Sequence, residues 1–300
     1  MRACLDCLPC LARNAIELAR RSARGEAALE GRIAAEGMRI LGRAAEEGYA
    51  LPPPCYARQL IDNALAMSGG AMPDPWAAEK KRSTELALKL MARLDEISGW
   101  DPNSFESCLR LAIAGNILDF SIYADLDMAA AMETMATAFT KPIDTAAVAE
   151  LKRRMDEAKS ILWIFDNCGE AVFDRLLMEP YREKVTLAVR GKPAFNDLTR
   201  AELAESGYPE GYAAGGVVSN DDGVPGVVDA TCGDAFRAAF SRADLVVAKG
   251  QANFETMSAR TDKPIAFLFL AKCPVVCREV GAPPQTIQVV LHNFERTVEK

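Results

Sequence analysis

The sequence predicts an α/β protein, in which an all-helical N-terminal part precedes an open, mainly parallel, Rossmann-like sheet. Three observations predict this fold class. Apolar residues recur at helical spacing through the first half, short continuous apolar runs begin only after residue 159, and helical stretches separate several of these runs. We therefore expect a helical domain over residues 1–157 and an α/β domain over residues 158–300.

The first half shows helical periodicity in segments that are rich in Ala, Leu, Met, Glu and Arg, which favour helices. These segments span residues 11–24, 30–47, 75–94, 105–117 and 146–158. The breaks fall at residues 51–54, at Gly69 and Gly70, and at residues 100–103, where Pro, Gly and Asn indicate turns or helix starts. No alternating strand pattern lies between them, so this half is expected to be helical.

The second half contains short apolar runs that are typical of strands buried on both faces. They span residues 161–165, 185–189, 245–248, 265–270 and 287–291. Helices are predicted over residues 171–178, 200–206 and 234–242. Alternation of strand and helix favours a parallel sheet covered by helices.

Composition excludes several classes of protein. The net charge is −7 and Lys and Arg are scattered, so the basic stripe of a nucleic-acid-binding protein is absent. No apolar run reaches the length of about 18 residues that a membrane span needs. The N-terminal residues lack a basic stretch followed by an apolar core, so we expect no signal peptide. Nine cysteines, an odd number, favour free thiols in a reducing cytoplasm.

Polar residues follow four of the predicted strands directly, and these positions are the candidate site. In open α/β sheets, ligands bind beyond the carboxyl ends of the strands. The first run is followed by Asp166, Asn167, Gly169 and Glu170, and the second by Arg190, which leads to Asn196 and Asp197. The third is followed by Lys249, Gly250, Gln251, Asn253 and Glu255, and the fourth by Lys272.

The residue types at these exits indicate a metal and a phosphate. Asp166 and Asp197 offer carboxylates and Asn167 offers an amide oxygen, and hard oxygen ligands suit Mg²⁺ or Mn²⁺. Lys249 and Lys272 would place two positive charges beside that metal. A transferred phosphoryl group is stabilised mainly by positioning and positive charge, and the helix start near Gly169 adds an anion site. The residues thus predict a divalent-metal-dependent phosphatase whose partner is a small phosphorylated metabolite.

Histidine usage narrows the alternatives. The chain has one histidine, His292, in the last apolar run, and we expect it to be structural. A zinc hydrolase rich in His, a Ser–His–Asp hydrolase or a Cys–His peptidase is difficult to build from one histidine.

At these residues the sequence resembles the damage-control phosphatase family, once catalogued as a domain of unknown function. The matching segments are residues 165–170 with Asp174, 192–197, 243–255 and 270–275. Residues 114–120 look like the glycine–asparagine motif of the family, and Cys4 and Cys7 look like the start of its prokaryotic branch. The resemblance spans nearly the whole chain.

The resemblance implies a metal-dependent phosphatase that acts on sugar phosphates or damaged phosphorylated metabolites. It implies metal ligands at Asp166, Asn167 and Asp197, and a phosphate-binding lysine at Lys272. It also implies that Asn116 and Asp119 reach the site from the helical part. Together with the strand exits, this gives a catalytic set and a substrate-binding set. The first comprises Asp166, Asp197 and Lys272; the second comprises Asn116, Asp119, Asn167, Glu170, Lys249, Gly250, Asn253 and Lys272.

One segment departs from the family pattern. Relatives commonly carry an acidic residue shortly before the Pro225–Gly226 turn, where this chain has Gly223, and Asp221 and Asp222 lie upstream instead. A role of this loop in substrate choice is therefore not expected to transfer directly.

Two other functions remain open from sequence. Cys4, Cys7 and Cys10 are spaced so that they could hold zinc or an iron–sulfur cluster or act as a redox switch, although no second Cys-x-x-Cys follows and the thiols could simply pack. A nucleotide-cofactor methyltransferase would need a glycine-rich turn after the first strand, where only Gly169 stands. The oligomeric state and the choice among Mg²⁺, Mn²⁺, Co²⁺ and Ni²⁺ also stay open.

Overall fold

The computed structural model describes residues 1–70, 74–116 and 128–294. Within them lies a six-stranded sheet with the order β3-β2-β1-β4-β5-β6. The strands are β1 Ile161–Ile164, β2 Val185–Val189, β3 Val217–Ser219, β4 Leu245–Lys249, β5 Ile265–Ala271 and β6 Thr286–His292. All neighbours are parallel except β5 and β6, which are antiparallel. The predicted α/β fold with a mainly parallel sheet is confirmed.

Both faces of the sheet are covered, which explains why its strands read as continuous apolar runs. On one face, Leu162 and Ile164 belong to a hydrophobic cluster with the helices α9 Asp234–Arg242, α10 Gln251–Met257 and α11 Pro274–Val280. On the other face, Ile161 and Trp163 pack in a larger cluster that includes α8 Cys168–Met178. Successive side chains of β1 therefore point to opposite faces, as the pleat requires.

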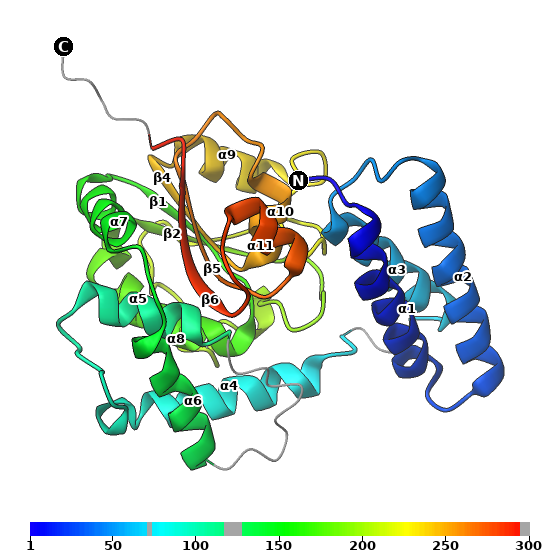
Figure 1. The fold of residues 1–300 in the computed structure, drawn as a ribbon, viewed down its shortest axis with the longest axis horizontal. Helices are drawn as coiled ribbons and strands as arrows, with labels where there is room; N and C mark the ends of the chain where they lie inside the picture. Colours follow the sequence, from blue (N-terminus) through cyan, green and yellow to red (C-terminus); the bar gives the residue numbers. More distant parts are fainter. Residues whose placement is uncertain (71–73, 117–127, 295–300) are drawn as a thin grey trace.

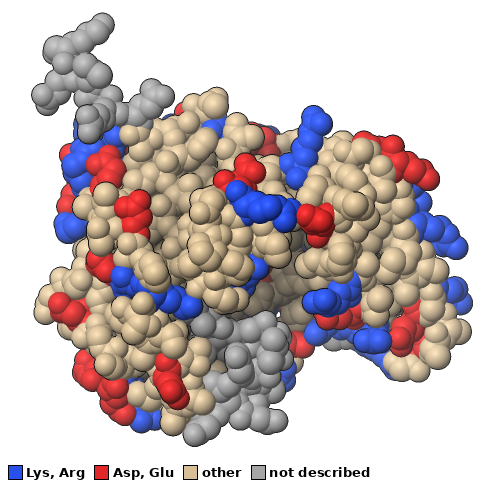
Figure 2. All heavy atoms as spheres, viewed as in Figure 1, with Lys and Arg blue, Asp and Glu red and all other residues tan. Residues whose placement is uncertain are grey.

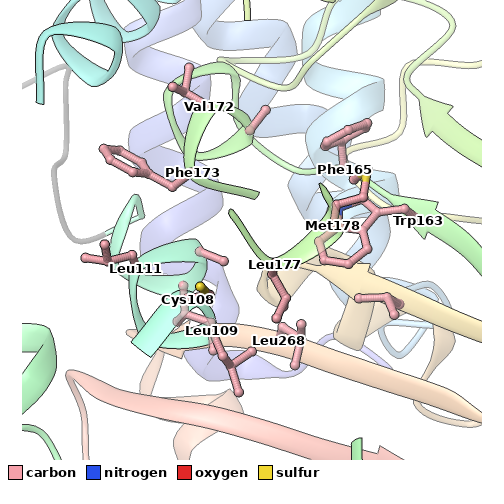
Figure 3. Close-up of a cluster of buried hydrophobic side chains, with 14 of the residues drawn as sticks. Cys108, Leu109, Leu111, Trp163, Phe165, Val172, Phe173, Leu177, Met178 and Leu268 are labelled. Carbon is pink, nitrogen blue, oxygen red and sulfur yellow. The ribbon is translucent and has the colours of Figure 1, made fainter. Parts of the chain in front are cut away.

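The larger cluster also takes in helices from the first half of the chain. These are α4 Ala77–Met91, α5 Phe105–Ala114, α6 Met128–Thr140 and α7 Thr145–Glu157. Figure 3 shows Leu109 and Leu111 of α5 in one cluster with Phe173 of α8 and Leu268 of β5. A third cluster belongs mainly to α1 Leu8–Ala23, α2 Ala27–Glu46 and α3 Pro53–Met67, which lie together beside the sheet in Figure 1. The buried side chains thus group α4 to α7 with the sheet rather than with α1 to α3. The domain boundary at residue 157 stays a prediction.

Two local predictions were wrong or incomplete, and a third was confirmed. Within residues 200–206, only Arg200–Glu202 forms a 3-10 helix, which Thr199 and Glu202 cap, and the residues after Glu202 form turns rather than a helix. At residues 51–54 the predicted turn or helix start is a helix start: α3 begins at Pro53, where a proline without an N–H costs nothing in the first helical turn. The edge strand β3 went unnoticed because it contains only three residues.

The surface charge and the composition of the helices can be described directly. On the face drawn in Figure 2, basic and acidic side chains are interspersed. Among the described residues, none of the helices combines the length and the apolar composition that crossing a bilayer requires.

Candidate metal- and phosphate-binding site

The loops after β1 and β2 meet at the carboxyl edge of the sheet, as the parallel topology predicts. Asn167 and Asp197 form an isolated antiparallel bridge. The backbone N–H of Leu198 donates to the carbonyl oxygen of Asp166 at 2.8 Å, and that of Cys168 donates to Asn196 at 3.0 Å. These bonds hold the two loops, and hence both aspartates, side by side.

Asp166 and Asp197 form what we call the open carboxylate pair, because each has one oxygen without a hydrogen bond from the described residues. The Oδ2 atom of Asp166 accepts hydrogen bonds from the amides of Asn116 and Asn167, both at 3.1 Å. The Oδ2 atom of Asp197 accepts one from Nε of Arg190 at 2.6 Å. Within the described chain, no hydrogen bond reaches either Oδ1 atom, so two oxygens remain available to a cation.

Burial dominates the electrostatics of this pair. It raises the pKa of Asp166 well above its ordinary value, and the charges of Asp197 and Glu170 add to the rise. Burial also raises the pKa of Asp197, although the charge of Arg190 opposes it. Two buried carboxylates held this close repel each other unless a cation or a proton lies between them.

Arg190, which stands at the exit of the second predicted strand, is a site residue to which the sequence interpretation gave no role. Its side chain is buried, and besides Asp197 it donates to the carbonyl oxygen of Gly226 at 3.0 Å and to Oδ1 of Asn253 at 3.3 Å. A buried guanidinium with three fixed acceptors orients the carboxylate that it pairs with. The signal was present, because Arg190 is the first residue after the apolar run of β2.

Asn116 joins the helical part to the site. Its Nδ2 atom donates to Asp166 and, at 2.7 Å, to Oε2 of Glu170. Its Oδ1 atom and its carbonyl oxygen both accept hydrogen bonds from the ammonium of Lys272, the former at 2.6 Å. The prediction that Asn116 reaches the site is therefore consistent with the geometry. Asp119 lies outside the described residues.

Lys249, Glu170 and Asp174 form a second buried group, which we call the closed cluster. The ammonium of Lys249 donates to Glu170, to Asp174 at 2.7 Å and to the carbonyl oxygen of Ala112 at 2.7 Å. The second carboxylate oxygens are also engaged, that of Glu170 by Asn116 and that of Asp174 by the indole N–H of Trp163 at 3.2 Å. All three donor protons of Lys249 are thus used, and this geometry gives no support to the predicted substrate contact.

The charges within the closed cluster follow from burial and pairing. Burial raises the pKa of Asp174 to about 7, although the charge of Lys249 opposes the rise. The two carboxylates raise the pKa of Lys249 above its usual value in spite of burial. The lysine therefore stays charged. The cluster contacts the site through Glu170, which accepts a hydrogen bond from Asn116.

The predicted site residues of the third strand exit hold backbone in place. The Nδ2 atom of Asn253 donates to the carbonyl oxygens of Lys249 at 2.6 Å and Phe165 at 3.3 Å. Gly250 has φ +80°, and a Cβ atom there would collide with the carboxylate of Asp166. Glycine is thus required for its backbone conformation and for this close approach.

The loop of residues 219–226 folds onto itself and onto Arg190. The Nδ2 atom of Asn220, a buried side chain, donates to Asp222 and to the carbonyl oxygen of Gly226. Asp222 also caps the backbone N–H of Val224 at 3.0 Å. The shifted carboxylate thus stabilises its own loop, and this loop supplies the carbonyl that Arg190 holds.

A cavity of about 550 Å³ opens where the α1–α3 group faces the sheet edge. Asp197 and Lys272 line it, together with Gln251, Glu255 and Phe195. Its volume lies in the usual range for small-molecule sites, roughly 300–1,000 Å³. Arg58 of α3 donates to the carbonyl oxygen of Pro193 at 3.1 Å, which fixes the helices to a loop of the site. The predicted phosphate-binding lysine and one predicted metal ligand therefore share a ligand-sized space.

The N-terminal thiols give limited support to the metal or redox alternative. The Sγ atoms of Cys4 and Cys7 are 3.8 Å apart, and burial raises the pKa of Cys7 to about 12, which keeps it protonated near neutrality. Among the described residues, no group of three or more His, Cys, Asp or Glu side chains is arranged to hold a metal ion. This finding also means that the predicted site would rest on two carboxylates and an amide oxygen.

That smaller donor set suits a hard cation. The Oδ1 atoms of the open carboxylate pair have no hydrogen bond from the described residues, and the amide of Asn167 uses its nitrogen toward Asp166. Mg²⁺ typically takes only one or two carboxylates and completes its shell with water and phosphate oxygens. The residues present therefore fit such an ion.

The fold and the site define a class: an open α/β protein with an oxygen-lined, lysine-containing cavity at the carboxyl ends of its strands. Residues 3–286 match the damage-control phosphatase ARMT1-like domain, and the chain belongs to this family. The resemblance seen in the sequence is confirmed.

Named relatives and a solved structure agree. The damage-control phosphatase PH1575 of Pyrococcus horikoshii is 35% identical over 227 residues, covering 74% of this chain and 76% of that protein. A damage-control phosphatase of Archaeoglobus fulgidus is 31% identical over 215 residues, covering 69% and 72%. The crystal structure of the DUF89-family protein PH1575 superposes with a TM-score of 0.82 at 28% identity, covering 97% of this chain and 99% of that one.

Proposed function

We propose that this protein is a divalent-metal-dependent phosphatase that hydrolyses small phosphorylated metabolites, either sugar phosphates or damaged phospho-metabolites. The observation that carries the proposal is the open carboxylate pair beside the cavity that Lys272 lines. The names of the relatives support phosphatase activity.

Asp166, Asn167 and Asp197 are the proposed metal ligands, and Mg²⁺ or Mn²⁺ is the expected ion, with Co²⁺ or Ni²⁺ as further candidates. When bound, such an ion would neutralise phosphate charge and polarise the phosphorus–oxygen bond that breaks. The amides of Asn116 and Asn167 hold Oδ2 of Asp166, and the guanidinium of Arg190 holds Oδ2 of Asp197. The Oδ1 atom of each carboxylate would then be the one that holds the ion.

Lys272 is proposed to bind the phosphoryl group and to stabilise the negative charge that it carries in the transition state. Asn116 positions this lysine through two acceptor oxygens while it also holds Asp166. One side chain thus sets the position of the phosphate-binding cation relative to that of the metal ligand. Glu170 takes part indirectly, since it fixes Asn116.

The proposed setting is the cytoplasm, and the partner is a small metabolite rather than a nucleic acid or a membrane. All nine cysteines are free, which is usual for proteins of a reducing compartment.

The test is removal and restoration of the metal. Protein stripped with EDTA and then freed of the chelator should lose its activity toward a panel of phosphate monoesters, and added Mn²⁺ or Mg²⁺ should restore it. Elemental analysis of the stripped protein is the control. Full turnover by protein shown to contain no metal would contradict the proposal.

A further inference from the structure

Glu255 is a carboxylate in the candidate cavity that the proposed reaction leaves unused. It lies on α10 one helical turn after Gln251, so the two side chains share a face of that helix. Gln251 accepts hydrogen bonds from the backbone N–H groups of Lys272, at 2.7 Å, and Cys273, at 3.1 Å. Gln251, Lys272 and Glu255 all line the cavity, so Glu255 faces the same space as the phosphate-binding lysine.

The carboxylate of Glu255 differs from the other acids of the cavity in lacking a bonded partner. Asp6 pairs with Arg278, and Asp197 pairs with Arg190. Among the described residues, no hydrogen bond or ion pair reaches the side-chain oxygens of Glu255. The amino group of Met1 donates to the backbone oxygen of Glu255 and to the hydroxyl of Ser258, but not to the carboxylate. A half-buried carboxylate that faces a cavity and has no bonded partner is free to accept a hydrogen bond from a ligand in that cavity.

The neighbours of Glu255 define what it would recognise. Burial raises its pKa to about 7, against the opposing positive charge of the chain terminus, so above neutrality it is an ionised acceptor. Leu11, Pro54 and Phe195 contribute apolar surface to the same cavity. Among its described lining residues, Lys272 is the only lysine or arginine. The space therefore has one cation for one phosphate, and an acid for the remainder of the ligand.

We propose that Glu255 is a specificity-determining residue, which accepts a hydrogen bond from a hydroxyl or amine on the organic part of the substrate and disfavours a second anionic group. This inference rests on the proposed phosphatase function and deepens it. The favoured class is a monophosphate ester rich in hydrogen-bond donors, such as a sugar monophosphate. A bisphosphate would bring its second phosphate into a cavity that holds an unpaired carboxylate, which is unfavourable.

The test compares glucose 6-phosphate, glucose 1,6-bisphosphate and p-nitrophenyl phosphate at pH 8 with Mn²⁺ present. Glu255→Ala should lower the ratio of kcat/KM for glucose 6-phosphate to that for p-nitrophenyl phosphate by roughly 10- to 100-fold, mainly through KM, because a hydrogen bond to a charged group is lost. Glu255→Gln keeps an acceptor and removes the charge. It should retain much of this ratio and raise kcat/KM for the bisphosphate relative to the monophosphate.

Glu279→Gln is the matched control, since Glu279 is exposed and does not line the cavity. It should leave every ratio at its wild-type value. Wild-type ratios in Glu255→Ala, or an equal loss on all three substrates together with a lower melting temperature, would overturn the specificity role. A wild-type protein inactive on all three esters with Mg²⁺, Mn²⁺, Co²⁺ and Ni²⁺ would instead contradict the phosphatase proposal itself.

Discussion

The open carboxylate pair and the closed cluster lie next to each other, yet their hydrogen bonding differs. In the closed cluster, each carboxylate oxygen of Glu170 and Asp174 has a donor, and the ammonium of Lys249 donates to three oxygens. In the open pair, the bonds from described residues reach only the Oδ2 atoms of Asp166 and Asp197. The comparison teaches that buried charge alone does not identify a site, whereas incomplete bonding of buried charge does.

The largest effect is expected on stability, when the ion pairs of the closed cluster are broken. Lys249→Met removes the cation and leaves two carboxylates buried without it, which should lower the free energy of unfolding by about 3–5 kcal/mol. Urea unfolding of the metal-free protein measures this change. The matched control is Lys81→Met, whose side chain is 68% exposed and whose loss should change little. Equal stability of Lys249→Met and wild type would show that the cluster is not structural.

A smaller effect, on turnover rather than stability, is expected at Lys272. Lys272→Ala should reduce kcat by roughly 10²-fold, a typical cost of losing one charge-stabilising donor, while the melting temperature hardly moves. Lys152→Ala, which removes an exposed lysine of α7, serves as the control. Wild-type turnover by Lys272→Ala would show that the lysine does not bind the transferred phosphoryl group.

The smallest effect is expected at the N-terminal thiols. Burial raises the pKa of Cys7 to about 12, so at neutral pH its side chain is a protonated thiol rather than the thiolate that binds metals. Zinc and iron should be substoichiometric in protein purified without oxygen, and Cys4→Ser with Cys7→Ser should not change the metal content. Stoichiometric zinc or iron that is lost in this double variant would favour the alternative metal-binding function.

The strand exits could be predicted from sequence because their logic is topological. Parallel strands bring their carboxyl ends to one edge, so Asp166 after β1 and Asp197 after β2 had to approach each other. The family resemblance likewise pointed to Asn116, which lies 50 residues from the aspartate that it contacts. Such a contact between distant segments has no local signature.

The direction of each side chain could not be predicted. Lys249 and Lys272 both follow apolar runs, yet the former extends into the closed cluster and the latter lines the cavity. Arg190 and Glu255 stand at strand exits but received no role from the sequence for a related reason, since the geometry of their partners rather than their residue type distinguishes them. The short elements β3 and α10 escaped because three or seven residues carry too little periodicity.

The central claim is that the open carboxylate pair is a metal site, and Asp166→Asn tests it more cleanly than Asp197→Asn. Asp197 is paired with the buried Arg190, so its replacement also removes an ion pair. Asp166 receives its side-chain hydrogen bonds from the neutral amides of Asn116 and Asn167. Replacing it by asparagine therefore breaks no ion pair among the described residues.

The measurement is the melting temperature of metal-free Asp166→Asn and of wild type, before and after addition of Mn²⁺. Without metal, the variant should be as stable as wild type or slightly more so, since carboxylate repulsion is relieved. Mn²⁺ at about 100 times its Kd should raise the wild-type melting temperature by roughly 5 °C or more, and should leave that of the variant unchanged. An equal rise in both proteins would contradict the account.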